Sequence, residues 1–193
     1  DPVYKGNYSD DTLSRYAEFL PEIKDGDMKT ISQNLDYCGV NIYQGFSVSG
    51  EENNQIKRIY HDTGYARTAI GWPVVPESLY WGAKFLHERY GKPIVIAENG
   101  MSSTDWVFRD GHVHDAQRID FLERYLSSLK KAADEGVPVD GYFHWSLTDN
   151  FEWAYGYTER FGLIYVDYKT QKRTLKDSAL WYKKVIETNG DAI

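Results

Sequence analysis

The segment from residue 145 to residue 167 places aromatic rings and carboxylates next to one another. Flat rings stack on the C–H faces of sugars, and a carboxylate accepts a pair of hydroxyl hydrogen bonds. A purely structural loop would rarely keep so many rings outside a core, so the segment predicts a sugar-binding surface. Its rings and polar groups are Trp145, Phe151, Trp153, Tyr155, Tyr157 and Phe161, with Asp149, Asn150, Glu152, Glu159 and Arg160 between them.

Glu98 is a second candidate because it ends the apolar run Ile-Val-Ile-Ala and precedes Asn99 and Gly100. A carboxylate beside such a run is costly to bury without partners. Taken alone, the simplest interpretation is a solvated side chain next to an Asn-Gly turn. Polar and aromatic residues at two other predicted strand ends favour a functional role instead.

Three strands are expected to carry these candidates. Segments rich in β-branched and aromatic residues predict strands. The strand at residues 35–43 has few charges and should be covered on both faces. Their alternation with helices implies parallel strands, whose carboxyl ends form the ligand-binding rim of α/β folds. The strands are residues 35–43, ending in Asn41 and Tyr43, residues 93–97, leading to Glu98, and residues 139–147, containing Trp145 and followed by Glu152 and Trp153.

Apolar residues at helical spacing predict the three helices that follow these strands. The first should begin at Pro76 and end at Gly91, and the second should be capped by Asp115 and end at Gly136. The third should begin near Thr174, where Asp177 completes a capping-box pattern. The inward faces are Leu79, Ala83, Leu86 and Tyr90; Ile119, Leu122, Leu126, Leu129 and Ala133; and Leu175, Ala179, Tyr182 and Ile186.

Two long connections, residues 44–75 and 148–173, are expected to be functional loops, because structureless segments of that length are uncommon in compact domains. The second contains a possible hairpin at 162–167, and Glu51 to Asn54 is interpreted as a solvated loop. Upstream, a helix is expected at 10–20 and one or two helical turns at 27–32. The first eight residues suggest neither a signal peptide nor a helix start, and we expect a cut within a longer chain.

Composition excludes several classes of protein. The 193 residues carry a formal net charge of −7, which disfavours nucleic-acid binding, and no segment approaches the length of a membrane span. The single cysteine, Cys38, lies in an apolar segment and is expected to be a buried thiol. His112 and His114 lack a third nearby His or Cys ligand and are interpreted as surface residues rather than as a metal site.

The motifs IAENG and HWSLTDNFEWAYGYTERFGLIYVD resemble glycoside hydrolase family 1, the β-glucosidase family. The resemblance covers essentially the whole chain. It implies an α/β fold of the (β/α)8 TIM-barrel type, in which residues 1–193 supply the last three βα units of a single domain. It also implies a retaining hydrolase that needs no metal, and we expect no cofactor.

The resemblance assigns roles to eight residues. Glu98 matches the family nucleophile, and Tyr43 matches the tyrosine that hydrogen-bonds it. The expected sugar contacts are Asn41, Trp145, Glu152, Trp153 and Phe161, and Trp72 after Gly71 should border the leaving-group subsite. Two small departures are Ala97, where threonine is common, and Pro73, where an acidic residue is frequent.

A larger departure is the absence of the Asn-Glu-Pro motif that carries the family's acid/base glutamate. Retaining hydrolysis needs two carboxyl groups about 5–5.5 Å apart, and three strands cannot close an eight-stranded barrel. We therefore expect an N-terminal part of the same enzyme as a partner and an inactive isolated chain. A non-catalytic half-barrel that only binds sugar or self-associates is the alternative, and a regulatory pseudo-glycosidase is a weaker one.

The expected substrate is an unphosphorylated β-glucoside or a cello-oligosaccharide, with β-galactosides or β-fucosides as secondary substrates. Members that prefer 6-phosphorylated sugars carry serine and tyrosine where this chain has Glu152 and Phe161. A carboxylate there would repel a phosphate, which disfavours a 6-phospho-β-glucosidase. We expect a cytoplasmic rather than a secreted protein, although the missing segment would carry any targeting signal.

Overall fold

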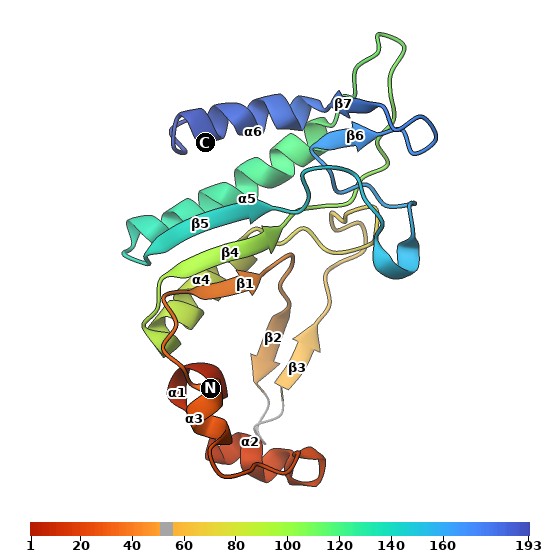
Figure 1. The fold of residues 1–193 in the computed structure, drawn as a ribbon. Coiled ribbons are helices and arrows are strands. Elements are labelled where there is room, and N and C mark those ends of the chain that lie inside the picture. Colours follow the sequence, from red (N-terminus) through yellow and green to blue (C-terminus); the bar gives the residue numbers. More distant parts are fainter. Residues whose placement is uncertain (51–55) are drawn as a thin grey trace.

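A parallel three-stranded sheet forms the centre of the computed structural model, which describes residues 1–50 and 56–193. Its strands are β1 (Cys38–Asn41), β4 (Ile94–Asn99) and β5 (Val139–His144), in the order β1-β4-β5. The helices α4 (Glu77–Tyr90), α5 (Ala116–Asp134) and α6 (Asp177–Glu187) lie along one side of this sheet (Figure 1). The predicted strand–helix alternation and parallel strands are therefore confirmed.

The register of the ladders brings the carboxyl ends of the strands together. Asn41 of β1 lies opposite Glu98 of β4, and Asn99 lies opposite His144 of β5. Both ladders shift register near these ends, so the paired segments are irregular where the candidate residues stand. Parallel pairing thus gathers side chains from three distant segments at one rim of the sheet.

The core lies between the sheet and the helices. Ile94 and Ile96 of β4 are fully buried against α4 and α5, and Cys38 is 3% exposed, as predicted. The expectation that residues 35–43 are covered on both faces is wrong for this chain, because Leu35 and Tyr37 are 39% and 52% exposed. β1 is an edge strand here, and the side of the sheet opposite the helices is open.

The predicted positions of α4 and α5 are confirmed, but the predicted start of α6 is wrong. Thr174 lies in the short strand β7 (Arg173–Leu175), and α6 begins only at Asp177, so the predicted capping box is not formed. Leu175 and Ile186 are exposed rather than inward-facing, whereas Ala179 and Tyr182 pack against the core. In α5 the buried alanine is Ala132, not Ala133.

The Asp115 carboxylate does not cap α5. It accepts hydrogen bonds from the backbone N–H and the hydroxyl of Ser178 in α6, and from Nε of Arg118. A long-range partner has therefore replaced the local cap, and this could not be foreseen from the local sequence.

The remaining elements are short. The first long connection contains a hairpin of β2 (Ser47–Gly50) and β3 (Ile56–Ile59). The second contains β6 (Ile164–Val166), which confirms a strand within 162–167, but its hairpin partner is β7, at the end of that connection and beyond it. Glu51 to Asn54 lie outside the described residues. None of the helices in residues 1–50 and 56–193 has the length and apolar character of a membrane span. The other elements are α1 (Pro2–Lys5), which was not predicted, α2 (Asp10–Arg15), η1 (Ala17–Phe19), α3 (Asp27–Ile31) and η2 (Trp153–Tyr155).

Candidate active site

Tyr43 and Glu98 meet beside the carboxyl ends of β1 and β4. The Tyr43 hydroxyl donates a hydrogen bond of 2.7 Å to Oε2 of Glu98, across 55 positions of sequence. Both residues are half-buried. Burial, then the hydrogen bond to Glu98 and the charges of Glu98 and Glu152, raise the pKa of Tyr43 far above its ordinary value. The phenol is thus a neutral donor to the carboxylate throughout the physiological pH range.

The two residues after this carboxylate fix the end of β4 by close packing. Asn99 is fully buried; its Nδ2 donates to the carbonyl of Ile42, and its Oδ1 accepts from the Tyr142 hydroxyl, each over 2.8 Å. A Cβ at Gly100 would lie 1.9 Å from the carbonyl oxygen of Trp145, so only glycine fits there. The Glu-Asn-Gly sequence therefore joins the ends of β1, β4 and β5.

A wall of aromatic rings extends from Tyr43. Its ring centroid lies 5.1 Å from that of Trp72, which lies 6.0 Å from that of Phe161, with interplanar angles of 58° and 55°. Phe161 is 1% exposed, whereas Trp72 is half-buried. Because Trp72 and Phe161 come from the two long connections, both connections contribute to the surroundings of Glu98.

The other predicted site residues lie nearer the solvent. Asn41 is exposed beside Glu98, Trp145 is half-buried, and Trp153 is 80% exposed in η2. Glu152 is close enough to Tyr43 to affect its pKa. Its Oε2 atom is buried, and no hydrogen bond reaches it within the described part of the chain. Glu152 can therefore accept hydrogen bonds from a ligand.

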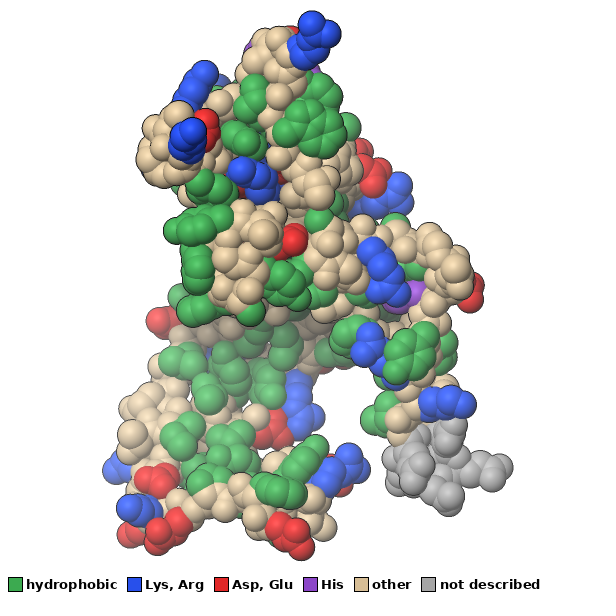
Figure 2. Space-filling view, turned by 90° about the vertical axis from the view of Figure 1, so that its right-hand side faces the viewer, with side chains coloured by type: hydrophobic (Ala, Val, Ile, Leu, Met, Phe, Trp, Pro, Cys, Tyr) green, Lys and Arg blue, Asp and Glu red, His purple; other side chains and the backbone are tan. Residues whose placement is uncertain are grey.

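The candidate site lies on an open face rather than in a closed pocket. Figure 2 shows the side toward which the carboxyl ends of the strands point, with hydrophobic side chains exposed between the sheet and the N-terminal helices. A cavity of about 720 Å³ lies elsewhere, between residues 65–77, 101–104 and 117–124. Its lining contains none of the eight predicted site residues.

The histidine-rich turn is a surface feature, as predicted. The ring nitrogens of His114 hydrogen-bond to Asp110 and Asp177 at 2.9 Å and 2.6 Å, and these bonds raise the pKa of His114 to about 8. Within residues 1–50 and 56–193, no group of three or more His, Cys, Asp or Glu side chains is arranged to hold a metal ion.

The family can be decided from sequence comparison. The sequence model described as glycosyl hydrolase family 1 matches residues 1–191, nearly the whole chain. The chain belongs to glycosyl hydrolase family 1.

Similar proteins from this family include enzymes of known structure. Beta-glucosidase A of Thermotoga maritima is 45% identical over 191 residues, and 1,4-beta-D-glucan glucohydrolase of Thermotoga neapolitana is 44% identical over 191 residues; each match covers 98% of this chain and 43% of the relative. The structure of the Thermotoga maritima beta-glucosidase in complex with glucoimidazole matches with a TM-score of 0.88 over the same shares. The chain thus spans about two fifths of the length of these relatives, which agrees with the predicted partial barrel.

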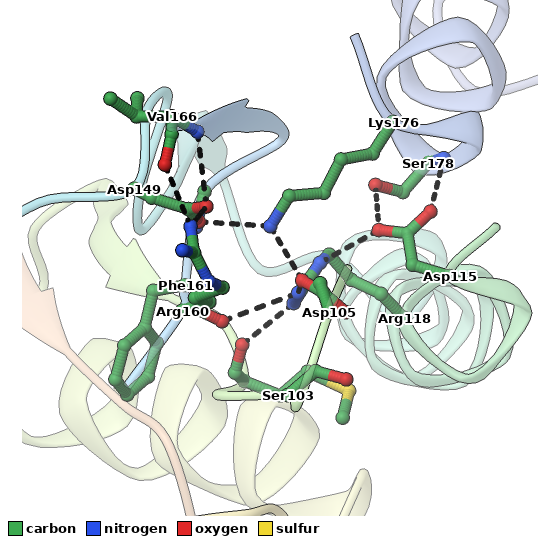
Figure 3. A network of polar contacts seen from close by, with 12 residues as sticks. Ser103, Asp105, Asp115, Arg118, Asp149, Arg160, Phe161, Val166, Lys176 and Ser178 are labelled. Atoms are coloured by element: carbon green, nitrogen blue, oxygen red, sulfur yellow. Dashed lines mark hydrogen bonds and ion pairs between the residues drawn. The ribbon is translucent and has the colours of Figure 1, made fainter. Parts of the chain in front are cut away.

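A buried network of charges supports the aromatic wall of this family 1 chain (Figure 3). Asp149 is its centre. Oδ1 of Asp149 accepts hydrogen bonds from the backbone N–H of Gly162 and from Nζ of Lys176, at 3.0 Å and 2.9 Å. Oδ2 accepts from Nη1 of Arg160 at 2.5 Å and from the N–H of Val166 at 3.3 Å. The residues on both sides of Phe161 are therefore held by one carboxylate.

The same network reaches the loop after β4 and the start of α5. Arg118 and Lys176, both fully buried, each pair with Asp105, and Arg118 also pairs with Asp115. Burial alone would raise the pKa of Asp105, but the charges of Arg118 and Lys176 outweigh it, and the pKa is lowered. Three cations and three carboxylates, Arg118, Arg160, Lys176, Asp105, Asp115 and Asp149, balance in charge.

Sequence reasoning did not find this network. One signal was available: Arg118 lies four and seven residues before Leu122 and Tyr125, on the buried stripe of α5. A charge on an apolar stripe indicates a buried ion pair, because an unpaired charge there would be prohibitively costly. No comparable signal marks Lys176 or Asp105, which pair with each other across 71 positions of sequence.

His144, at the end of β5, contacts the segment around Phe161. Its Nε2–H donates to the Phe161 carbonyl over 3.2 Å, and its buried Nδ1 has no partner within the described residues. Burial, followed by the positive charge of Arg118, lowers the pKa of His144 from 6.5 to about 3. His144 is therefore neutral in the folded protein at physiological pH.

We predict that Asp149→Asn destabilises the protein by about 3–5 kcal/mol, because it leaves buried positive charge unpaired. All four groups that contact the Asp149 carboxylate are donors, so the new amide NH2 must face one of them. Urea unfolding measures the change. Asp120→Asn is the matched control, since Asp120 forms an exposed pair with Arg124 and should cost less than about 1 kcal/mol. Equal effects of the two substitutions would contradict the role of the network.

We also predict that His144 makes stability depend on pH. The unfolded chain binds a proton at this group below pH 6.5, whereas the folded protein binds it only near pH 3. Stability from this group is complete above pH 6.5 and falls by up to about 1.4 kcal/mol per pH unit as the pH is lowered toward 3. The free energy of unfolding, measured with urea at several pH values between 4.5 and 7, should change less steeply with pH for His144→Asn than for the parent. An identical pH dependence of the unfolding free energy in the two proteins would show that His144 titrates normally in the folded state.

Proposed function

We propose that this chain, assembled with a segment that supplies the rest of the barrel, forms a retaining β-glucosidase in which Glu98 is the nucleophile. The observation that carries the proposal is the 2.7 Å hydrogen bond from the neutral Tyr43 hydroxyl to Oε2 of Glu98 at the rim of the sheet. Membership of glycosyl hydrolase family 1 and the names of the relatives support it. This chain together with that segment is the assembled enzyme.

The hydrogen bond leaves one oxygen of Glu98 for attack. Tyr43 occupies Oε2, and within the described residues no hydrogen bond reaches Oε1. In the first step a lone pair of Oε1 forms a bond to the anomeric carbon, the glycosidic C–O bond breaks, and the leaving oxygen takes a proton from an acid on the other segment. Water then attacks the same carbon and gives its proton to that residue. The bond from this carbon to Oε1 breaks, which restores the Glu98 carboxylate and releases the sugar with retained configuration.

The surroundings of Glu98 favour a sugar as the ligand. Trp72 and Phe161 supply ring faces. Further contacts come from Asn41 at the end of β1, from Trp145 directly after β5, and from Glu152 and Trp153 in the second connection. Residues 44–75 and 148–173 thereby serve as active-site loops. The unpartnered Oε2 of Glu152 suits a hydroxyl donor and repels a phosphate, which disfavours 6-phosphorylated substrates.

Relatives guide the choice of sugar. Their names include beta-glucosidase, 1,4-beta-D-glucan glucohydrolase and, for a Bifidobacterium breve enzyme 39% identical over 206 residues, bifunctional beta-D-glucosidase/beta-D-fucosidase. We therefore propose β-glucosides and cello-oligosaccharides as substrates, with β-fucosides as secondary ones.

An N-terminal part of the same enzyme is the proposed partner. Large side chains are exposed in and next to β1 and β5, among them Tyr37, Phe143 and Leu147, at 52%, 62% and 67%. Five further strands would cover this surface and supply the acid/base carboxyl group. The alternative, a half-barrel that only binds sugar or self-associates, is also favoured by this exposed surface.

Co-expression distinguishes the two possibilities. We predict that the chain alone does not hydrolyse an aryl β-glucoside, and that co-expression with the N-terminal part of the Thermotoga maritima relative gives a one-to-one complex with activity. Light scattering and hydrolysis of the aryl glucoside measure both properties. A stable homo-oligomer that does not bind the N-terminal part would favour the half-barrel.

We predict that Glu98→Gln in the assembled enzyme lowers kcat by roughly 10⁴-fold or more, because an amide is a poor nucleophile. The thermal unfolding midpoint should change little, since glutamine keeps the shape and one acceptor oxygen. Glu123→Gln, on an exposed turn of α5, is the matched control and should leave kcat unchanged. Near-normal hydrolysis by Glu98→Gln would reject the assignment.

A further inference from the structure

A single hydroxyl group on α5 connects the two segments that surround Glu98. Tyr125 donates a hydrogen bond from its hydroxyl to the backbone carbonyl of Tyr43 over 3.1 Å. The same oxygen accepts a hydrogen bond of 2.8 Å from the backbone N–H of Val75. Tyr43 is the hydrogen-bond partner of Glu98, and Val75 lies three residues after Trp72. The hydroxyl thus bridges the end of β1 and the segment that carries Trp72.

Both backbone groups depend on this hydroxyl. Within the described residues, neither the Tyr43 carbonyl nor the Val75 N–H has another hydrogen-bond partner. A buried backbone group that loses its partner is costly, so the chain would move to find another one. Such a movement would shift the Tyr43 ring relative to Glu98 and relative to Trp72.

The position of the hydroxyl is fixed from outside the sheet. Tyr125 is fully buried, and its ring stacks on Phe121 with centroids 4.0 Å apart and an interplanar angle of 20°. Leu122 and Leu129 of the same helix pack in the same core. Because buried aromatic rings in a packed core have few alternative rotamers, the helix presents the hydroxyl at a defined point.

We propose that Tyr125 is a positioning residue for the hydrolytic reaction, which holds Tyr43 in place to hydrogen-bond Glu98 and sets its distance from Trp72. The proposal rests on the proposed function of Glu98 and Tyr43, and it adds a residue that lies on a helix outside the sheet. Tyr125 contacts no substrate; it acts through the main chain of Tyr43.

A double-mutant cycle in the assembled enzyme tests this proposal. Tyr125→Phe removes only the hydroxyl oxygen, and Tyr43→Phe removes the hydrogen bond to Glu98. Tyr125→Phe removes both hydrogen bonds of the hydroxyl. We expect it to lower kcat for an aryl β-glucoside by about tenfold, with KM changed much less, because the Tyr43 carbonyl loses its partner. In the Tyr43→Phe background the same substitution should lower kcat by less than about twofold, because coupled residues are not additive.

Tyr80→Phe is the matched control. Its hydroxyl donates to Glu135 over 2.6 Å and joins α4 to the end of α5, away from Glu98. Tyr80→Phe removes a tyrosine hydroxyl and its hydrogen bond from the helix layer without touching Tyr43 or Val75, and it should leave kcat unchanged. Rates are expressed per active site, counted by the burst of released aglycone, so that a smaller folded fraction of any variant does not lower kcat.

The outcomes separate the two proposals. A tenfold loss that disappears in the Tyr43→Phe background supports the positioning role. An equal loss in both backgrounds, or unchanged kcat for Tyr125→Phe in an active enzyme, overturns the positioning role and leaves the proposed function intact. An assembled enzyme whose parent form lacks glycosidase activity overturns both.

Discussion

A hydrogen bond between a neutral phenol and a carboxylate, at the aligned ends of two parallel strands, is the interaction on which the site depends. Tyr43 and Glu98 lie 55 residues apart, and only the register of β1 against β4 brings them together. A carboxylate beside an apolar strand must be paired to be tolerated, and a tyrosine pairs it without adding charge. The Tyr43 hydroxyl therefore orients the carboxylate through Oε2, while Oε1 stays open to a ligand.

Rigidity behind this pair comes from groups that are themselves expensive to bury. The six charges around Asp149 and Arg118 have lost their hydration, and pairing offsets that loss only if the geometry is good. Such a network contributes little net stability compared with an apolar core, but it tolerates few alternative arrangements. It connects the loop after β4, the start of α5 and the segment around Phe161, so the aromatic wall is held by long-range contacts.

Periodicity and composition predicted most of the fold because they report on local burial. The stripe of α4, that of α5 except at Ala133, and the apolar run of β4 were predicted correctly. The polar strand ends indicated the rim where Tyr43, Glu98, Trp72 and Phe161 lie. Two predictions failed for the same physical reason. The Asp115 carboxylate bonds to Ser178 and to the Arg118 side chain rather than capping the backbone of α5, and β1 is exposed because no described element of this chain covers its open side. Partners distant in sequence cannot be read from a local pattern, and Tyr125, Asn99 and Lys176 were missed for that reason.

Trapping the covalent glycosyl-enzyme is the most direct measurement of the central claim. The assembled enzyme would be incubated with a 2-deoxy-2-fluoro-β-glucoside bearing a good leaving group, then digested and mapped by mass spectrometry. The fluorine slows the release of the sugar from the nucleophile, so the residue that attacks the anomeric carbon keeps the label. We predict label on the peptide that contains Glu98. Label confined to another acidic residue, in an enzyme that is otherwise active, would contradict the assignment.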